Sequence, residues 1–441
     1  RAEIYLSDEP LIAAEHHDAT TPQGLVGKLV EDLKRAERPV LLIGGGVRSP
    51  GAVAALNKFA RTVGVPLFPT WNALDLVPRD LPMFGGTIGT YGCGVGRNFA
   101  VQQTDVVLSV GCRMSGRLSG GREKDFLRGA KRIFAVDIDR GVLDNLAPVR
   151  HSPGRVSMLC VDASAFVAQL TARDFTWRDR YDIPARPQWL TEVFTWRDRY
   201  DAGANAQKPV AEGLNPYAFV RALSDAAPSN AIITSECGGN AVIMHQAFRV
   251  KTGQRFFSSH GNSPMGGGLS YGIGAALAAP DRPVICVVGD AGLAASAHEL
   301  LSLHVHGRKL KNLRVFVLNN HCMGITRAYQ ATNLGGRFVA CGPDRESGYE
   351  TPDFGELCDA YQVRAGWIAN PATMLEAVAS WFDADGPVVV DVDCGDWQDY
   401  SPRIAGFDRP IEEATPSLPP EEFLAQMKYI EPLPGWRERR G

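Results

Sequence analysis

Two apolar strands separated by a helical segment dominate residues 284–324 and constrain the fold most. Val284–Val288 and Arg314–Leu318 are β-branched, apolar runs of the kind that form buried parallel strands. Between them, Leu300 and Leu303 follow a helical pattern. A strand–helix–strand crossover is right-handed and parallel in nearly all proteins. The segments that follow the two strands should therefore emerge at the same edge of one sheet, where open α/β sheets bind ligands.

Asp290 and Asn320 follow these two strands and should lie side by side, although 30 positions separate them. One carboxylate, one amide oxygen and nearby backbone carbonyls form a hard oxygen site. Such a site suits Mg²⁺ that keeps some coordination positions for a bound phosphate. A Gly-Asp turn or an Asn-Asn pair alone is more often structural than metal-binding. The combination of two strands, a helix and both motifs is more specific.

Glycine-rich segments follow a second pair of predicted elements. Glu236–Asn240 comes directly after the strand Ala231–Thr234, and Ser258–Gly268 precedes a predicted helix at Leu269–Ala279. Glycines at the start of a helix let backbone N–H groups approach an anion, which the helix dipole also favours. The alternative is that these glycines only allow close packing of helix on strand. The predicted metal site beside them favours a phosphate.

These motifs resemble those of the thiamine diphosphate enzymes of the acetolactate synthase type. In that family an Asp, the second Asn of a pair and a carbonyl two residues later bind Mg²⁺, which holds the cofactor diphosphate. The resemblance implies Asp290, Asn320 and the carbonyl of Cys322 as metal ligands. Two residues depart from the family pattern: Ala291 replaces a glycine, and Gly292 stands where a hydroxyl residue often contacts the diphosphate. These departures bear on one hydrogen bond to the cofactor and not on the metal ligands.

The resemblance also implies a set of cofactor-binding residues. Met265 matches the apolar residue that supports the bent form of the cofactor. The full set is Gly238, Gly239, Asn240, Met265, Gly289, Asp290, Ala291, Gly292, Asn320 and Met323. Glu236 and His260 have no counterpart in the family pattern, and His260 would either line a substrate pocket or cap a turn. No catalytic residue can be assigned, because the glutamate that drives proton relay in the family lies on a pyrimidine-binding domain.

The order of elements predicts an α/β protein with two doubly wound parallel-sheet domains. An octapeptide, FTWRDRYD, occurs at 175–182 and again at 194–201, which we interpret as a duplication within a surface linker. The C-terminal segment should wrap the protein surface or a neighbouring subunit. The predicted divisions are an exit strand and linker at 1–23, a central nucleotide-binding-like domain at 24–171, a linker at 172–213, a thiamine diphosphate and Mg²⁺ domain at 214–399 and a tail at 400–441.

The central domain at 24–171 carries a weak signal for dinucleotide binding. Gly44–Gly46 follow a strand, and Asp137 and Asp139 end another, but the spacing is not that of the GxGxxG fingerprint. The domain resembles the central domain of acetolactate synthases, which in many members carries FAD. Bound FAD is one alternative, and a purely structural domain is the preferred one.

The resemblance implies a carboligase or lyase, a transferase that decarboxylates a 2-keto acid donor and transfers its acyl carbanion to a carbonyl acceptor. Alternatives are a simple 2-keto acid decarboxylase and a non-catalytic cofactor-binding or regulatory subunit. Only the second and third of the usual three family domains are recognisable. We therefore expect a partner, either a pyrimidine-binding chain or a cleaved N-terminal fragment, within a homo- or hetero-oligomer.

Composition excludes several other classes. The 441 residues carry a formal net charge of −3, so nothing favours nucleic acid or a membrane surface as a partner. No run of 18 apolar residues predicts a transmembrane helix. The nine cysteines are scattered singly, which favours reduced thiols and a cytoplasmic location over a disulfide framework or a zinc site.

Overall fold

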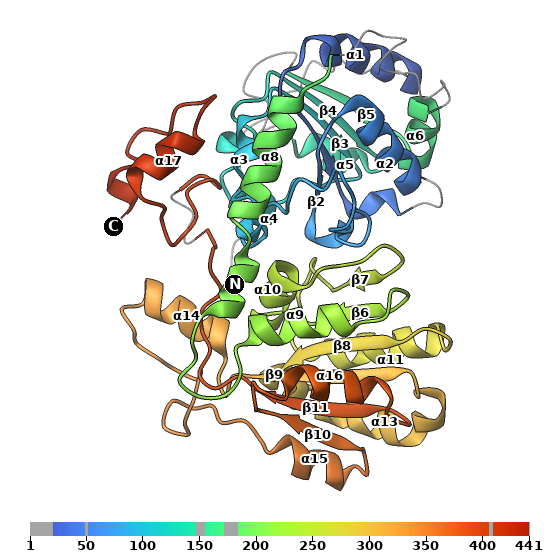
Figure 1. The fold of residues 1–441 in the computed structure, drawn as a ribbon, viewed down its shortest axis with the longest axis vertical. Coiled ribbons are helices and arrows are strands. Elements are labelled where there is room, and N and C mark those ends of the chain that lie inside the picture. The colour runs from blue at the N-terminus through green and yellow to red at the C-terminus, as the bar shows by residue number, and fades with distance from the viewer. Residues whose placement is uncertain (1–20, 49–51, 147–154, 172–183, 405–408, 441) are drawn as a thin grey trace, which may run out of the picture.

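The computed structural model describes residues 21–48, 52–146, 155–171, 184–404 and 409–440. Two α/β domains lie one above the other along the long axis of the molecule, and the C-terminal segment runs along one side (Figure 1). The exit strand predicted near the N-terminus lies outside the described residues, as does the first copy of the octapeptide.

The first domain is a five-stranded, fully parallel sheet with the strand order β2-β1-β3-β4-β5. Every residue of β1 and β3 is buried, as expected for strands that are apolar apart from Ser109. The strands are β1 (Pro39–Ile43), β2 (Leu67–Pro69), β3 (Val106–Val110), β4 (Arg132–Asp137) and β5 (Val156–Cys160).

Helices cover both faces of this sheet. Alternate strand residues point to opposite faces: Leu41 packs with α1 (Pro22–Arg35), α2 (Ala52–Val63) and α6 (Ala163–Thr171), whereas Leu42 belongs to the core on the other face. The helices on that second face are α3 (Phe99–Gln103), α4 (Gly116–Ser119), α5 (Arg140–Asp144) and α8 (Pro187–Arg199).

The second domain is a six-stranded parallel sheet with the order β10-β11-β9-β8-β6-β7. The predicted neighbours Val284–Val288 and Arg314–Leu318 are indeed adjacent and parallel, with Val287 opposite Phe316. The strands are β6 (Ile232–Ser235), β7 (Arg255–Phe257), β8 (Val284–Gly289), β9 (Leu313–Asn319), β10 (Ala365–Ile368) and β11 (Val388–Asp393).

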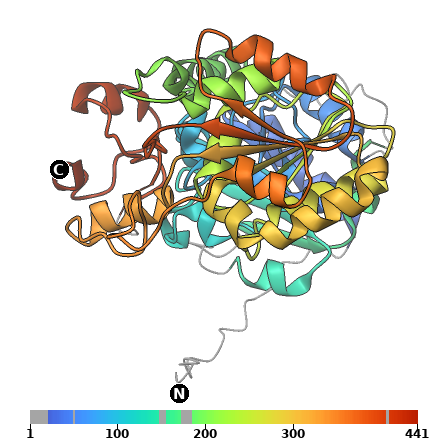
Figure 2. The ribbon, with the colours of Figure 1, turned by 90° about the horizontal axis from the view of Figure 1, so that it is seen from below.

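Helices again lie on both faces, as the view from below makes plain (Figure 2). One face carries α9 (Pro216–Ala226), α10 (Gly239–Ala247) and α16 (Met374–Phe382). The other carries α11 (Gly268–Ala278), α12 (Asp290–Ala295), α13 (Leu300–His306) and α15 (Phe354–Ala360), while α14 (Gly324–Asn333) follows β9 at the sheet edge. The predicted fold class, two doubly wound parallel-sheet domains, is confirmed.

The predicted surface linker is wrong for the second octapeptide copy. That copy forms the end of α8 and the turn after it, and its Trp196 is only 2% exposed. Trp189 and Trp196 stack edge to face at 5.9 Å within the core of the first domain. A sequence rich in charge and tryptophan therefore forms an amphipathic helix, whose aromatic side chains are buried.

The described C-terminal segment packs back onto the first domain of its own chain. Asn98 donates to the carbonyl of Ile411 at 2.8 Å, and Gln102 donates to the buried Glu412 at 2.7 Å. Phe423, on α17 (Pro420–Gln426), joins the core beside Trp196 and Phe99. The expectation that this segment wraps the protein surface agrees with these contacts.

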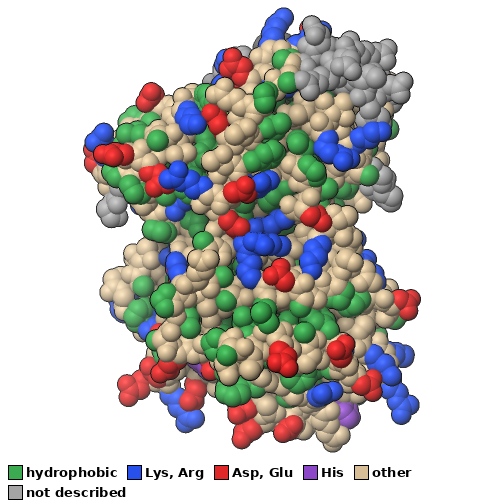
Figure 3. Space-filling view, viewed as in Figure 1, with side chains coloured by type: hydrophobic (Ala, Val, Ile, Leu, Met, Phe, Trp, Pro, Cys, Tyr) green, Lys and Arg blue, Asp and Glu red, His purple; other side chains and the backbone are tan. Residues whose placement is uncertain are grey.

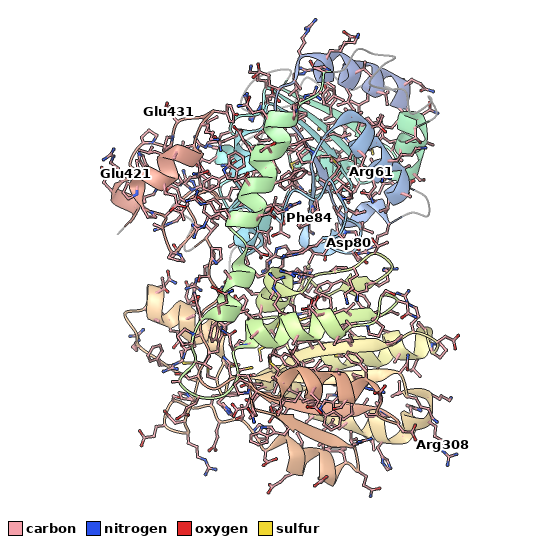
Figure 4. The ribbon with its side chains drawn as sticks, in the orientation of Figure 1. Arg61, Asp80, Phe84, Arg308, Glu421 and Glu431 are labelled. Atoms are coloured by element: carbon pink, nitrogen blue, oxygen red, sulfur yellow. The ribbon has the colours of Figure 1, made fainter. Side chains whose placement is uncertain are left out.

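Charged residues join the two domains at their seam, where Lys and Arg side chains gather in the middle of the face in Figure 3. Arg79 of the first domain donates to Asp201 at 3.1 Å and to the carbonyl of Gln246 at 2.8 Å. Asp80, labelled in Figure 4 at the edge that faces the second domain, accepts from the backbone of Thr252 at 3.0 Å. These contacts fix the position of one domain against the other.

No helix in the described ranges is both long enough and apolar enough to cross a bilayer. The eight cysteines that the structure describes with their side chains are all free.

Candidate functional site

A pocket opens at the carboxyl ends of four neighbouring strands of the second domain. The chain leaves β6 towards β7 on one side and returns to β8 on the other, so the pocket lies at the point where the strand order reverses. Ligands bind at such switch points in open α/β sheets. All eleven residues that we predicted for the cofactor and the metal line it: Gly238, Gly239, Asn240, Met265, Gly289, Asp290, Ala291, Gly292, Asn320, Cys322 and Met323.

Asp290 is the first residue of α12 and sits at the floor of this pocket. Its side chain is buried, and Oδ1 accepts from the backbone of Ala291 at 2.8 Å, while Oδ2 is buried with no hydrogen-bond partner. Burial raises the pKa of Asp290 to about 7. A buried carboxylate oxygen without a partner is costly, and a bound cation would satisfy it.

Asn320 follows β9 and faces the same pocket. Its Nδ2 donates to the carbonyl of Trp397 at 2.8 Å and lies 3.5 Å from the hydroxyl of Tyr400. These contacts fix the plane of the amide.

Cys322 is buried beside Asn320, and burial raises the pKa of its thiol to about 12. The neutral thiol is a poor ligand for a hard cation. The Cys322 carbonyl accepts from Gly324 at 2.8 Å, and a carbonyl oxygen has a second lone pair. The carbonyl is thus the atom of this residue that can serve a magnesium ion.

The start of α10 forms the opposite wall of the pocket. Gly238 adopts a φ of +79°, which only glycine takes without strain, and α10 begins at the next residue. A side chain on Gly239 would collide with the ring of Tyr400. Gly238 and Gly239 both line the pocket at the start of this helix and carry no side chain, which suits an anion site.

The donor set fits Mg²⁺ with a diphosphate. Asp290 Oδ2 and Asn240 Oδ1 are both buried oxygens without partners, and both residues line the pocket. No three His, Cys, Asp or Glu side chains converge on a metal site in the part of the chain that the structure describes. The predicted site needs only one carboxylate, because an amide and a carbonyl complete it.

Glu236 also lines the pocket, and the sequence pattern gave it no role. It is the residue after β6 and is 3% exposed. Its Oε1 accepts from the backbone N–H of Gly266 at 2.6 Å and of Gly268 at 3.3 Å. Its position directly after an apolar strand, in a run that ends in glycines, was the available sequence signal.

Residues after β11 complete the pocket, and our sequence prediction missed them. They are Cys394, Trp397 and Tyr400, all buried. We had placed Tyr400 in the C-terminal tail. Their role follows from the sheet order, in which β11 lies beside β9 although β10 intervenes in the chain.

Met265 and His260 lie in different places. Met265, half exposed at 50%, stands at the rim of the pocket before α11. His260 instead lies at the domain seam, edge-on to Trp71 at 5.2 Å and to His245 at 4.4 Å. Burial lowers the pKa of His260 to about 2 and that of His245 to about 4, so both imidazoles are neutral.

The first domain also has a crevice, at the carboxyl ends of β1, β2 and β3. Gly44–Gly46, Trp71 and Arg113 line it, together with His260 from the second domain. Asp137 and Asp139, which had suggested a dinucleotide, are engaged locally: Asp139 caps α5, and Asp137 accepts from the Asp139 N–H at 3.0 Å.

The fold and the pocket together define an α/β protein with a diphosphate–metal crevice in its second domain. Comparison with known families specifies the class. Residues 236–392 match the thiamine pyrophosphate enzyme C-terminal TPP binding domain, and residues 26–158 match the central domain of the same enzymes. The chain belongs to the thiamine pyrophosphate enzymes.

Curated relatives carry the name acetolactate synthase. The chain is 26% identical over 410 residues to the acetolactate synthase isozyme 2 large subunit of Escherichia coli, covering 90% of this chain and 67% of that protein. It is 27% identical over 376 residues to a probable acetolactate synthase large subunit of Methanococcus aeolicus, covering 83% and 59%. It is 28% identical over 438 residues to the large subunit of Parasynechococcus marenigrum, covering 96% and 63%. The chain thus spans about three fifths to two thirds of the length of these relatives.

Proposed function

We propose that this chain binds thiamine diphosphate with Mg²⁺ in the pocket of the second domain. It would then act as an acetolactate synthase-like carboligase, a transferase or lyase that decarboxylates a 2-keto acid donor and transfers the acyl carbanion to a carbonyl acceptor. The observation that carries the proposal is the unpartnered, buried oxygen of Asp290 at the floor of a pocket that all the predicted residues line. The names of the relatives support the type of reaction.

Three parts of the chain would share the work of binding. Asp290, the Asn320 amide and the Cys322 carbonyl hold the metal, whose charge neutralises the diphosphate. The N-terminal turn of α10 offers N–H groups to the phosphate oxygens. Ile243, Leu318 and Met265 line the pocket with apolar surface, which limits water. Thiamine diphosphate, when bound, supplies the nucleophilic carbon and the electron sink that decarboxylation requires.

A complete site also needs a pyrimidine-binding domain, and we propose that it comes from a separate chain or a cleaved fragment within an oligomer. Met265, an apolar side chain that is 50% exposed at the rim of the pocket, supports a docking surface there. Turnover by the 441-residue chain alone, with Mg²⁺ and thiamine diphosphate, would contradict this part of the proposal.

FAD in the first domain is the alternative to a purely structural role, which we prefer. The visible spectrum of the purified protein distinguishes the two, because bound flavin absorbs there and the protein does not. Cytoplasmic location remains a prediction from the scattered cysteines.

Calorimetry tests the main proposal. Thiamine diphosphate should bind in the presence of Mg²⁺ and far more weakly in its absence. Product analysis with a 2-keto acid and the assembled partner then separates a C–C coupled product from a free aldehyde, the product of a simple decarboxylase. Absence of binding with the partner present favours the non-catalytic subunit.

A further inference from the structure

Glu236 joins three segments that surround the proposed cofactor pocket. Its Oε1 accepts from Gly266 and Gly268, before and at the start of α11, and its Oε2 lies 3.5 Å from the N–H of Gly289, at the end of β8. Its own N–H donates to Val287 at 3.1 Å. One side chain therefore ties the segment after β6 to the segments that carry Met265 and Asp290.

The position of the carboxylate explains how a buried acid is tolerated there. Burial raises the pKa of Glu236, and the three backbone N–H groups oppose that shift. One of these groups, the N–H of Gly268, belongs to the first residue of α11, an 11-residue helix whose dipole stabilises negative charge. Glu236 thus occupies amides that a bound anion would otherwise use.

Gly292 lies against the side chain of Glu236 and leaves room for it. It lies in α12 with no unusual backbone angle, so its conformation does not demand glycine. A Cβ at this position would overlap Oε2 of Glu236 and press on its Cδ, and the three nearest atoms to that Cβ all belong to Glu236. The glycine is required by the space that Glu236 fills.

We propose that Glu236 and Gly292 are a matched pair, in which Glu236 is a positioning residue that takes the place of a side chain at 292 and holds the Met265–Gly268 segment and Gly289 around the cofactor. This inference rests on the proposed function for its effect on thiamine diphosphate, but not for its effect on the free protein. It gives a physical reason for the departure at position 292, where related sequences often carry a hydroxyl residue. A serine in this chain would displace Glu236.

The experiment compares Glu236→Ala, Glu236→Gln, Gly292→Ser and the double variant Glu236→Ala/Gly292→Ser. Amide hydrogen exchange of the cofactor-free protein measures the pair directly. We expect exchange in the peptide around Gly266 and Gly268 to rise at least tenfold in Glu236→Ala and in Gly292→Ser. Glu236→Gln keeps an oxygen for these amides and should stay close to wild type. Thermal unfolding of each variant verifies that it is folded.

The second measurement is the affinity for thiamine diphosphate with Mg²⁺. Each of Glu236→Ala and Gly292→Ser should weaken binding about tenfold, and the double variant should be no weaker than the single ones, because serine then enters an empty space. Gly274→Ser, at an exposed glycine of α11 with no atom within 4 Å of an added Cβ, is the matched control and should change neither measurement.

The proposed coupling is wrong if Gly292→Ser has the hydrogen exchange and the thiamine diphosphate affinity of the wild type. It is also wrong if the losses of affinity in the two single variants add up in the double variant. The two proposals fail separately. If the wild-type protein does not bind thiamine diphosphate, the proposed function is wrong, while hydrogen exchange in the free protein still decides whether Glu236 and Gly292 are coupled.

Discussion

The two domains share the order of their first four strands but close their switch-point crevices by different means. In the first domain, backbone meets backbone: Gly44 donates to Val110 at 3.0 Å and Gly46 to Gly111 at 3.2 Å. In the second, the segments after β6 and β8 are joined by the side chain of Glu236. The first crevice is lined by glycines and Arg113, and the second by buried acceptors such as Asp290.

This difference shows that a doubly wound sheet determines where a ligand can bind, but not which ligand binds. Parallel strand ends supply a crevice in both domains. In the second domain, Asp290 and Asn240 carry buried oxygens without partners, which a bound cation would satisfy. Among the described residues that line the first crevice, the buried polar atom without a partner is a ring nitrogen, Nε2 of His260, and not a carboxylate or amide oxygen. The residues after each strand therefore decide the chemistry.

Asp290→Asn should give the largest loss of cofactor affinity. A smaller loss would contradict the difference that we describe between the two crevices. Loss of the carboxylate should weaken binding of thiamine diphosphate and Mg²⁺ at least 100-fold by calorimetry, about 2.7 kcal/mol. The cofactor-free variant should unfold at a higher temperature, because a buried, unpartnered charge is gone. Asp137→Asn, the matched change at a strand end of the first domain, should alter neither binding nor stability appreciably. Equal losses in both variants would contradict the assignment.

Gly44→Ala tests the backbone closure of the first crevice. An added Cβ would overlap the carbonyl oxygen of Gly111, so we expect the free energy of unfolding to fall by about 2–3 kcal/mol. Gly27→Ala, in α1 with open space around it, should instead raise it by about 0.5–1 kcal/mol. Urea unfolding measures both. An unchanged stability in Gly44→Ala would show that the two loops can separate without cost.

Acid should lower the free energy of unfolding through protonation of His245, which packs at the seam between the domains. Its folded pKa, about 4, lies below its ordinary value of 6.5, so the folded state resists protonation that the unfolded state accepts. The contribution is present above pH 6.5 and is lost as pH falls towards 4, amounting to about 2 kcal/mol between pH 6.5 and 5. His245→Phe keeps the ring beside Trp71 and Phe256 and should remove that part of the acid sensitivity.

The control for this seam is His298→Gln, because His298 is exposed. Urea unfolding at pH 5 and pH 7 gives the difference for each variant. If His245→Phe keeps the pH dependence of the wild type, His245 is not a source of the acid sensitivity of folding.

Met265→Ala should give the smallest effect. The side chain is half exposed, so the free energy of unfolding should change by less than about 0.5 kcal/mol. Affinity for thiamine diphosphate should fall about threefold to tenfold if the side chain supports the cofactor. Leu277→Ala, similarly exposed at 46%, is the matched control and should bind normally. Equal affinity in both variants would remove Met265 from the cofactor site.

Local sequence patterns determined the sheets and most of the pocket. The predicted strands Val284–Val288 and Arg314–Leu318 lie within β8 and β9, because long apolar runs specify their own structure. The short strands Val156–Cys160 and Arg255–Phe257 were missed, since three to five residues carry little periodic signal. The strand-end residues Asp290 and Asn320 could be paired from sequence because a single crossover joins their strands.

Only the tertiary structure decided which distant residues meet at that pocket. Tyr400 reaches Asn320 because β11 inserts between β9 and β10, an order that no local pattern encodes. Trp196 is buried because α8 packs on a sheet formed far earlier in the chain. Glu236 and Gly292 are matched because β6 and β8 are neighbours. The hydrophobic period of a segment shows which of its residues are buried. These contacts depend instead on how separate segments are arranged in space.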